Sequence, residues 1–151
     1  MSAARSGDLR AALAAGRITI GFDGELGTEI VAASGQQVVL KLRIEPRHLQ
    51  PNAIVHGGVW AALAETAASI GASLNTSKQV AGIENHTSFL RAISDGEVTV
   101  TADPIHPGRS TQVWNVVISD QASGVPGPVA RSTVRLYVLP DGRPGRATNQ
   151  P

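Results

Sequence analysis

The chain has 151 residues, a length that fits a single compact domain. Hydrophobic residues make up 42% of it and charged residues 17%, and this composition excludes a disordered chain. Thirteen basic against twelve acidic residues give a net charge of +1, so no strong field favours nucleic acid or a membrane as partner. The absence of cysteine excludes disulfides, cysteine zinc sites and thiol catalysis.

The N-terminal residues contain charged side chains that interrupt any apolar run before it reaches signal-peptide length, so we expect a cytoplasmic protein. Residues 8–15 predict a short amphipathic helix at the periphery, ended by Gly16. Turn residues and β-branched residues then alternate, which predicts three short strands. These strands are expected over residues 18–22, 29–33 and 38–44.

One long helix is expected over residues 51–77, where apolar side chains recur at helical spacing. They are Val59, Leu63, Ala67, Ile70 and Leu74. The other faces of this helix carry small residues, mostly alanine, where a surface helix would carry Lys and Glu. We therefore expect the helix to be enclosed on most sides. Its polar residues, including His56 and Glu65, exclude a membrane span.

After the helix, the pattern predicts four more strands, with a loop over residues 121–128. These strands are expected over residues 80–90, 96–105, 111–119 and 129–139. Strands on both sides of one enclosed helix predict an α+β fold in which an antiparallel sheet covers the helix. A monomer would leave strand edges and one sheet face exposed, so pairing with a second copy is expected.

Three regions follow from this organisation. Residues 1–17 are expected to form an N-terminal helical extension, and residues 18–139 the folded domain. Residues 140–151, rich in Pro and Gly, are expected to be a disordered tail.

The start of the long helix is a candidate site, because it reads His56-Gly57-Gly58. Two glycines leave backbone N–H groups uncovered at the positive end of the helix dipole, a place suited to hold a developing negative oxygen. The alternative is that the glycines only allow the chain to turn into the helix and pack closely.

Glu65 is the one Asp, Glu, Lys or Arg residue between positions 51 and 77, and it stands among small and apolar residues. We expect it at a pocket or an interface rather than on a solvent face. Ser69, one turn later, would either hydrogen-bond the Glu65 carboxylate or a water beside it, or bond back to the Glu65 carbonyl. Gly57 and Glu65 are roughly 12 Å apart along the axis, so one carbonyl can contact both only if they come from two subunits.

Several motifs together resemble the hotdog-fold acyl-CoA thioesterases. They are Gln50, His56-Gly57-Gly58, Glu65 and Ser69, followed by Asn85-His86-Thr87-Ser88-Phe89-Leu90-Arg91 and His106-Pro107-Gly108-Arg109-Ser110-Thr111. The nearest branch holds the Arthrobacter-type 4-hydroxybenzoyl-CoA thioesterase and phenylacetate-pathway (PaaI-type) enzymes. The resemblance implies a sheet wrapped around the central helix, shared sites in a homodimer, and commonly a dimer of dimers.

The resemblance also implies roles for residues. Gly57 would donate its N–H to the thioester oxygen, His56 would shape the turn, and Gln50 would orient the thioester. Glu65 would act as nucleophile or as general base, and Ser69 would position water. Substrate contacts would come from Gly58, Asn85, His86, Arg91, Arg109, Ser110 and Thr111, with Arg131 a further residue near coenzyme A. The arginines could equally be ordinary charges at strand ends.

The sequence differs from many members of this family at two positions, and three aromatic residues are candidates for the acyl pocket. Gln50 matches the aryl-CoA branch where many relatives have Asn, whereas Ala53 replaces a common Gly and suggests an altered loop. Trp60, Phe89 and Trp114 are candidates for the acyl pocket or for plain core.

No metal or separate cofactor is expected, since coenzyme A is part of the substrate and the histidines lack paired ligand spacing. The expected activity is hydrolysis of an acyl-CoA thioester. A dehydratase of hydroxyacyl thioesters is disfavoured because its characteristic His motifs are missing from the sequence. The remaining alternative is a non-catalytic acyl-CoA-binding or scaffold protein.

Overall fold

The computed structural model describes residues 11–120 and 124–140. Its elements are α2 (Gly21–Leu26), β1 (Glu29–Ala33), β2 (Val38–Arg43), the short 3₁₀ helix η1 (Pro46–His48), α3 (Gly57–Thr76), β3 (Val80–Phe89), β4 (Glu97–Pro107), β5 (Thr111–Ser119) and β6 (Ala130–Val138). The six strands form one antiparallel sheet in the order β1-β2-β4-β5-β6-β3. The predicted α+β architecture, a hotdog fold, is therefore confirmed.

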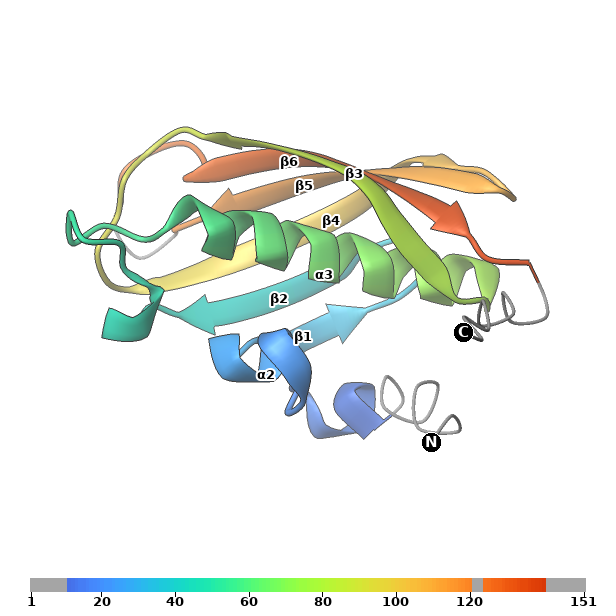
Figure 1. The fold of residues 1–151 in the computed structure, drawn as a ribbon, viewed down its shortest axis with the longest axis horizontal. Coiled ribbons are helices and arrows are strands. Elements are labelled where there is room, and N and C mark those ends of the chain that lie inside the picture. Colours follow the sequence, from blue (N-terminus) through green and yellow to red (C-terminus); the bar gives the residue numbers. More distant parts are fainter. Residues whose placement is uncertain (1–10, 121–123, 141–151) are drawn as a thin grey trace, which may run out of the picture.

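Helix α3 lies across one face of the sheet (Figure 1). It follows β2 in the chain and precedes β3, which is an edge strand of the sheet. The sheet strands alternate buried and less buried residues, as expected for a sheet with one covered face. The helix contributes a broad buried surface to the same core. Burial of α3 against the sheet therefore forms the centre of the domain.

Close packing between α3 and the sheet occurs at Gly71. A Cβ added at this glycine would lie 2.4 Å from Cη2 of Trp114, which is fully buried on β5. The indole N–H donates to the side-chain oxygen of Gln112, and the Gln112 amide donates to Asn75 of α3, both at 2.8 Å. This chain of hydrogen bonds holds the polar edge of the indole inside the core.

The N-terminal segment differs from its prediction. A strand was expected over residues 18–22, but Gly21–Leu26 form helix α2, and β pairing nearby is limited to an isolated bridge between Arg17 and Glu29. The helix ends at Gly27, whose φ of +82° is left-handed and favours glycine. Burial of Leu26 in the core stabilises the helix over the local strand preference.

The boundaries of the other elements named here differ less from their predictions. The long helix begins at Gly57 rather than at residue 51, because residues 51–56 form a loop. Residues 11–15 are helical as predicted, while residues 8–10 lie outside the described part of the chain. Ala12 and Leu13 pack against the core. The predicted tail also falls outside the described residues, except for Pro140.

The described residues contain no helix that is both long enough and apolar enough to cross a membrane.

Packing at Gly71 yields a stability prediction. In an exposed helix, Gly→Ala would stabilise by about 1 kcal/mol, but overpacking a filled core costs about 1–3 kcal/mol. We expect Gly71→Ala to lower the free energy of unfolding by about 1–2 kcal/mol in urea titrations. Ser73→Ala on the same helix is the control, with an expected change of about 0.5 kcal/mol or less. A Gly71→Ala protein as stable as the wild type would contradict this account.

Candidate functional site

The first turn of α3 presents an uncovered amide. His56 is the N-cap residue, with extended backbone, and its Nδ1 accepts a hydrogen bond of 2.9 Å from the Gly58 N–H. Gly57 is the first helical residue, so its N–H has no acceptor within the helix. An uncovered N–H at the positive end of a 20-residue helix suits a partially negative oxygen.

A close contact from β3 explains the glycine at position 57. A Cβ added to Gly57 would lie 2.4 Å from Cε2 of the Phe89 ring. Phe89 is itself 61% exposed, so the ring contacts Gly57 while most of its surface stays open. Close approach of the two elements is therefore a concrete reason for glycine here, beside the uncovered amide.

Gln50 lies in the loop that leads into α3. Its backbone N–H donates to the Ile54 carbonyl, and its carbonyl accepts from the Ala53 N–H, both at 2.9 Å. Ala53 has a φ of +57°, the left-handed conformation that favours glycine. The altered loop expected from Ala53 thus keeps the backbone conformation of a glycine turn. Gln50, His56 and Gly57 lie at the same end of the helix.

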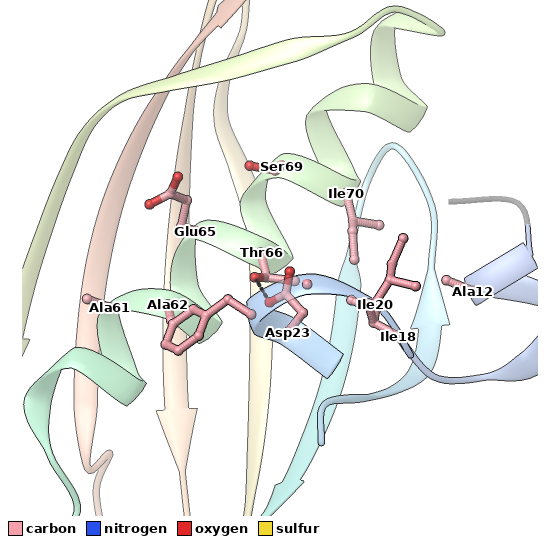
Figure 2. A pocket seen from close by; sticks show the side chains of 12 residues that line it. Ala12, Ile18, Ile20, Asp23, Ala61, Ala62, Glu65, Thr66, Ser69 and Ile70 are labelled. Atoms are coloured by element: carbon pink, nitrogen blue, oxygen red, sulfur yellow. Dashed lines mark hydrogen bonds between the residues drawn. The ribbon is translucent and has the colours of Figure 1, made fainter. Parts of the chain in front are cut away.

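A cavity of about 690 Å³ opens beside the middle of α3, between this helix and the N-terminal segment (Figure 2). The size is typical of small-molecule sites. Its lining residues are Ala12, Ile18, Ile20, Gly21, Phe22, Asp23, Ala61, Ala62, Glu65, Thr66, Ser69 and Ile70. Most are apolar, and the polar side chains are those of Asp23, Glu65, Thr66 and Ser69.

Glu65 lies where this cavity meets β3. A second hollow of about 220 Å³ is lined by Glu65 and by residues 82–85 of β3. A Cβ at Gly82 would lie 3.0 Å from the Glu65 Oε1 atom, so the strand makes room for the carboxylate at this glycine. The strand also has a bulge between Gly82 and Glu84 at this point. In the single chain Glu65 is exposed.

Three contacts fix α3 against β3. Phe89 packs on Gly57, the Asn85 side-chain amide donates to the Ala61 carbonyl at 2.9 Å, and Gly82 lies beside Glu65. Positions rise along α3 as they fall along β3, so the two elements run antiparallel. Asn85, predicted to bind substrate, thus holds the helix to the strand. Its Oδ1 accepts a bond of 2.7 Å from Thr87.

Ser69 lines the cavity one turn after Glu65. Thr76 shows the back-bond that a helical hydroxyl makes, donating to the Ala72 carbonyl at 2.9 Å. No such bond joins Ser69 to the Glu65 carbonyl among the described residues. The Ser69 hydroxyl is therefore available to a molecule in the cavity.

Asp23 and Thr66 are cavity residues that the sequence interpretation missed. Asp23 directly follows the strand expected over residues 18–22, but α2 carries it to α3, where the Thr66 hydroxyl donates to its Oδ1 (Figure 2). Burial raises the pKa of the Asp23 carboxyl above its usual value, and the Thr66 hydrogen bond partly offsets this rise. No local sequence signal marks this pair, because the two residues are 43 positions apart.

The predicted coenzyme A contacts are spread over the chain. Arg91 follows β3 and lies 3.7 Å from the carboxylate of Asp120, half-buried. Arg109 and Ser110 are exposed in the β4–β5 connection, where the Ser110 carbonyl accepts from the Val138 N–H at 2.9 Å. Because Val138 pairs with the first residue of β3, Arg91 and Arg109 lie at opposite ends of that strand.

The other residues predicted to contact substrate differ in exposure. Gly58, His86 and Arg131 are exposed, and Thr111, the first residue of β5, is half-buried. Trp60 and Trp114 are buried in the core, so neither lines the cavity. Within residues 11–120 and 124–140, no group of three or more His, Asp and Glu side chains could hold a metal ion.

Known proteins are similar to this chain in sequence and fold. The model of the thioesterase superfamily matches residues 52–126. The Mycobacterium tuberculosis protein Rv1847, named as a candidate esterase, is 39% identical over 127 residues, covering 81% of this chain and 89% of its own. Its solved structure gives a TM-score of 0.76 at 38% identity, over 83% of this chain and all of that one.

Two further relatives carry more specific names. The 1,4-dihydroxy-2-naphthoyl-CoA hydrolase of Listeria monocytogenes is 40% identical, over 68% of this chain and 85% of its own. Structures of the Staphylococcus aureus thioesterase SAV0944 match with TM-scores of 0.68 at 29% identity, over 75% of this chain and 93% of that one. They are of variants with a glutamate or a glutamine replaced by alanine, at positions fifteen apart. With this fold and these relatives, the chain belongs to the thioesterase superfamily and is a thioester hydrolase.

Proposed function

We propose that this protein hydrolyses acyl-CoA thioesters at a site shared by two copies of the chain. Glu65 of one copy and the Gly57 N–H of the other act on the same carbonyl. The observation that carries this proposal is the division of the site in the single chain. Gln50, His56 and Gly57 gather at the start of α3, whereas Glu65 and Ser69 line the cavity two turns later.

Distance makes the second copy necessary. Eight residues of helix separate Gly57 from Glu65 by roughly 12 Å, too far for both to touch one thioester. Two α3 helices related by a two-fold axis and running antiparallel would bring each Gly57 opposite a Glu65. The axis would pass level with Ala61, midway between them, whose small side chain permits close approach.

The edge of the sheet also supports a two-fold pair. β3 is an outer strand, and seven of its ten residues are exposed. Apolar side chains are among them, including Ile83 at 57% and Phe89 at 61% exposed. A long, apolar, unpaired edge is a template for pairing with another chain. Pairing of β3 with its own copy would cover this edge and enclose Glu65. Two such dimers would then form the tetramer that the family resemblance implies.

The chemistry needs no group beyond these residues and water. The Gly57 N–H stabilises negative charge on the thioester oxygen, and Gln50 orients the thioester. Glu65 either attacks the carbonyl, expelling the coenzyme A thiolate and leaving an anhydride that water cleaves, or removes a proton from an attacking water held by Ser69. Both routes break the same C–S bond and yield a free acid and coenzyme A.

The named relatives support both the residues and the substrate. Gln50 and Glu65 are fifteen positions apart, the same spacing as the glutamine and glutamate replaced in SAV0944. The Listeria relative is named for an aryl-CoA substrate. An aromatic acyl group fits the apolar cavity next to Glu65.

Glu65→Gln tests the acid. Since the chain has no cysteine, thiol released from benzoyl-CoA, phenylacetyl-CoA or fatty acyl-CoA can be measured with a chromogenic thiol reagent without protein background. We expect kcat to fall by about 10²-fold or more, because a carboxamide neither attacks nor takes a proton. Glu25→Gln, an exposed position on α2, should keep wild-type activity. Unchanged turnover in Glu65→Gln would remove the assignment.

A pair of substitutions at position 57 tests the amide. The first helical residue tolerates proline, and the extended backbone of His56 suits the residue before it. Gly57→Pro should therefore fold but lose the N–H, lowering kcat by about 10²–10³-fold. Gly57→Ala pushes on the Phe89 ring in the same way but keeps the N–H, so it is the matched control. Equal activities in the two variants would contradict the proposed role.

Mixed dimers test whether the site is shared. Glu65→Gln and Gly57→Pro chains, carrying different affinity tags, would be co-expressed and the heterodimer purified. A shared site leaves one site intact and places both lesions in the other, so about half of the wild-type activity should return. If each site were built within one chain, every site would carry a lesion and the heterodimer would stay inactive.

A further inference from the structure

His48 is a buried polar side chain that none of the steps described above uses. It is 2% exposed, and it ends the 3₁₀ helix η1 two residues before Gln50. Its ring makes two hydrogen bonds of 2.9 Å, in which Nδ1 accepts from the Glu45 N–H and Nε2 is joined to the Leu26 carbonyl. Because Nδ1 is an acceptor, the neutral ring carries its proton on Nε2 and donates it to Leu26.

The bond to Leu26 joins η1 to the N-terminal segment. Leu26 is the last residue of α2, and carbonyl groups in the last turn of a helix have no partner within that helix. The His48 ring supplies a partner from 22 positions further along the chain. α2 also forms part of the cavity wall, through residues 21–23. His48 therefore connects this wall to the segment that leads into α3.

The backbone of His48 opens a short hairpin, the entry hairpin (residues 48–56), which leads into α3. The His48 carbonyl accepts from the His56 N–H at 2.9 Å, and an antiparallel bridge lies next to this bond. The peptide that joins His56 to Gly57 carries the Gly57 N–H. The bond between His48 and His56 therefore helps to set the direction in which that N–H points.

Two hydrogen bonds anchor the entry hairpin to other parts of the fold. The Val55 N–H donates to the Ile93 carbonyl at 2.8 Å, and the His48 ring donates to Leu26. The first bond holds the side of the hairpin that enters α3, and the second holds the side that carries Gln50. Loss of the second bond would free that side to shift, and a displacement of about 1 Å in a group that orients substrate can lower a rate by about 10²-fold.

We propose that His48 is a positioning residue of the catalytic site. Its bond to Leu26 holds the entry hairpin, and the hairpin places Gln50 and the Gly57 N–H. This inference rests on the proposed function and adds a residue to the half of the site at the start of α3. In the proposed dimer that half acts together with Glu65 of the second copy, so His48 serves the site completed by the other chain.

Three substitutions separate the two bonds of the ring. In His48→Gln the amide nitrogen can replace Nε2 and donate to Leu26. In His48→Asn the amide oxygen can replace Nδ1 and accept from the Glu45 N–H, but the side chain is too short for Leu26. His48→Leu keeps the volume apolar and removes both bonds. Val100→Ala, at a buried position of β4 outside the entry hairpin, is the control for a general loss of stability.

Thiol release from the acyl-CoA panel is measured for each variant, with thermal melting as the test of folding. We expect kcat to fall about tenfold or more in His48→Asn and His48→Leu, with KM changed by about threefold or less, because the hairpin orients the reacting group. His48→Gln should keep most of the wild-type kcat. Val100→Ala should melt at a lower temperature and keep the wild-type kcat. A wild-type kcat in His48→Asn, or equal losses in His48→Asn and His48→Gln, would overturn the proposal.

Mixed dimers show in which half of the site His48 acts. A His48→Asn chain paired with a Glu65→Gln chain leaves one site complete and should regain about half of the wild-type activity. Paired with a Gly57→Pro chain, it leaves no site complete and should not exceed the His48→Asn homodimer. An effect through the wall at α2, beside Glu65 of the same chain, would give the reverse pattern, and a general loss of stability would restore neither pair. Either result contradicts the assignment of His48.

Failure of this inference differs from failure of the proposed function. If the wild type releases no thiol from any substrate, or if the dimer of Glu65→Gln and Gly57→Pro chains stays inactive, the proposed function fails and the role of His48 fails with it. If the wild type and that mixed dimer are active while the His48 variants match the wild type, the role of His48 alone is overturned.

Discussion

The structure depends on how one helix is held against the sheet. α3 is buried along most of its length, and Gly71 allows it to pack directly on the indole of Trp114. This packing sets the position of the helix across the strands, and three contacts with β3 set its position along them. The amide at Gly57 and the carboxylate at Glu65 are therefore fixed relative to each other by the core, rather than by flexible loops.

The same arrangement separates tasks within the site. The first turn of α3 and the loop before it supply backbone N–H groups, and the middle of the helix supplies an acid and a hydroxyl. Two turns of helix lie between these groups, so under the proposed function a single chain cannot bring both to one carbonyl. Under the proposed function, a dimer that covers the exposed β3 edge would also bring these two groups of residues together across its two-fold axis.

Much of the fold follows from the sequence because the relevant signals are local. The alternation in Val38–Arg43 and Thr111–Ser119 and the helical spacing from Val59 onward each match an observed element. The spacing of Gly57 and Glu65 could likewise be interpreted as soon as one helix was predicted. The strand predicted over residues 18–22 was wrong because Ile18 and Ile20 favour a strand locally. Long-range burial of Leu26 instead stabilises a helix that begins at Gly21.

The cavity could not be predicted for a related reason. Its two walls are distant in sequence, and the contact between Asp23 and Thr66 exists only once α2 packs beside α3. Local sequence patterns such as periodicity and turn residues do not predict a contact between residues this far apart in the chain. For the same reason, the sequence alone did not distinguish pocket from core positions for Trp60 and Trp114. Both are buried in the core of the structure.

The origin of the cavity wall has an evolutionary consequence. The superfamily match spans residues 52–126, which include the helix and its acid, whereas Ile18, Ile20 and Asp23 precede that span. Under the proposed function, mutations in the N-terminal segment would change which acyl groups the site accepts while leaving the proposed catalytic residues of α3 in place. Lineages sharing one catalytic framework could diversify by exchanging a stretch of little more than ten residues at the start of the chain.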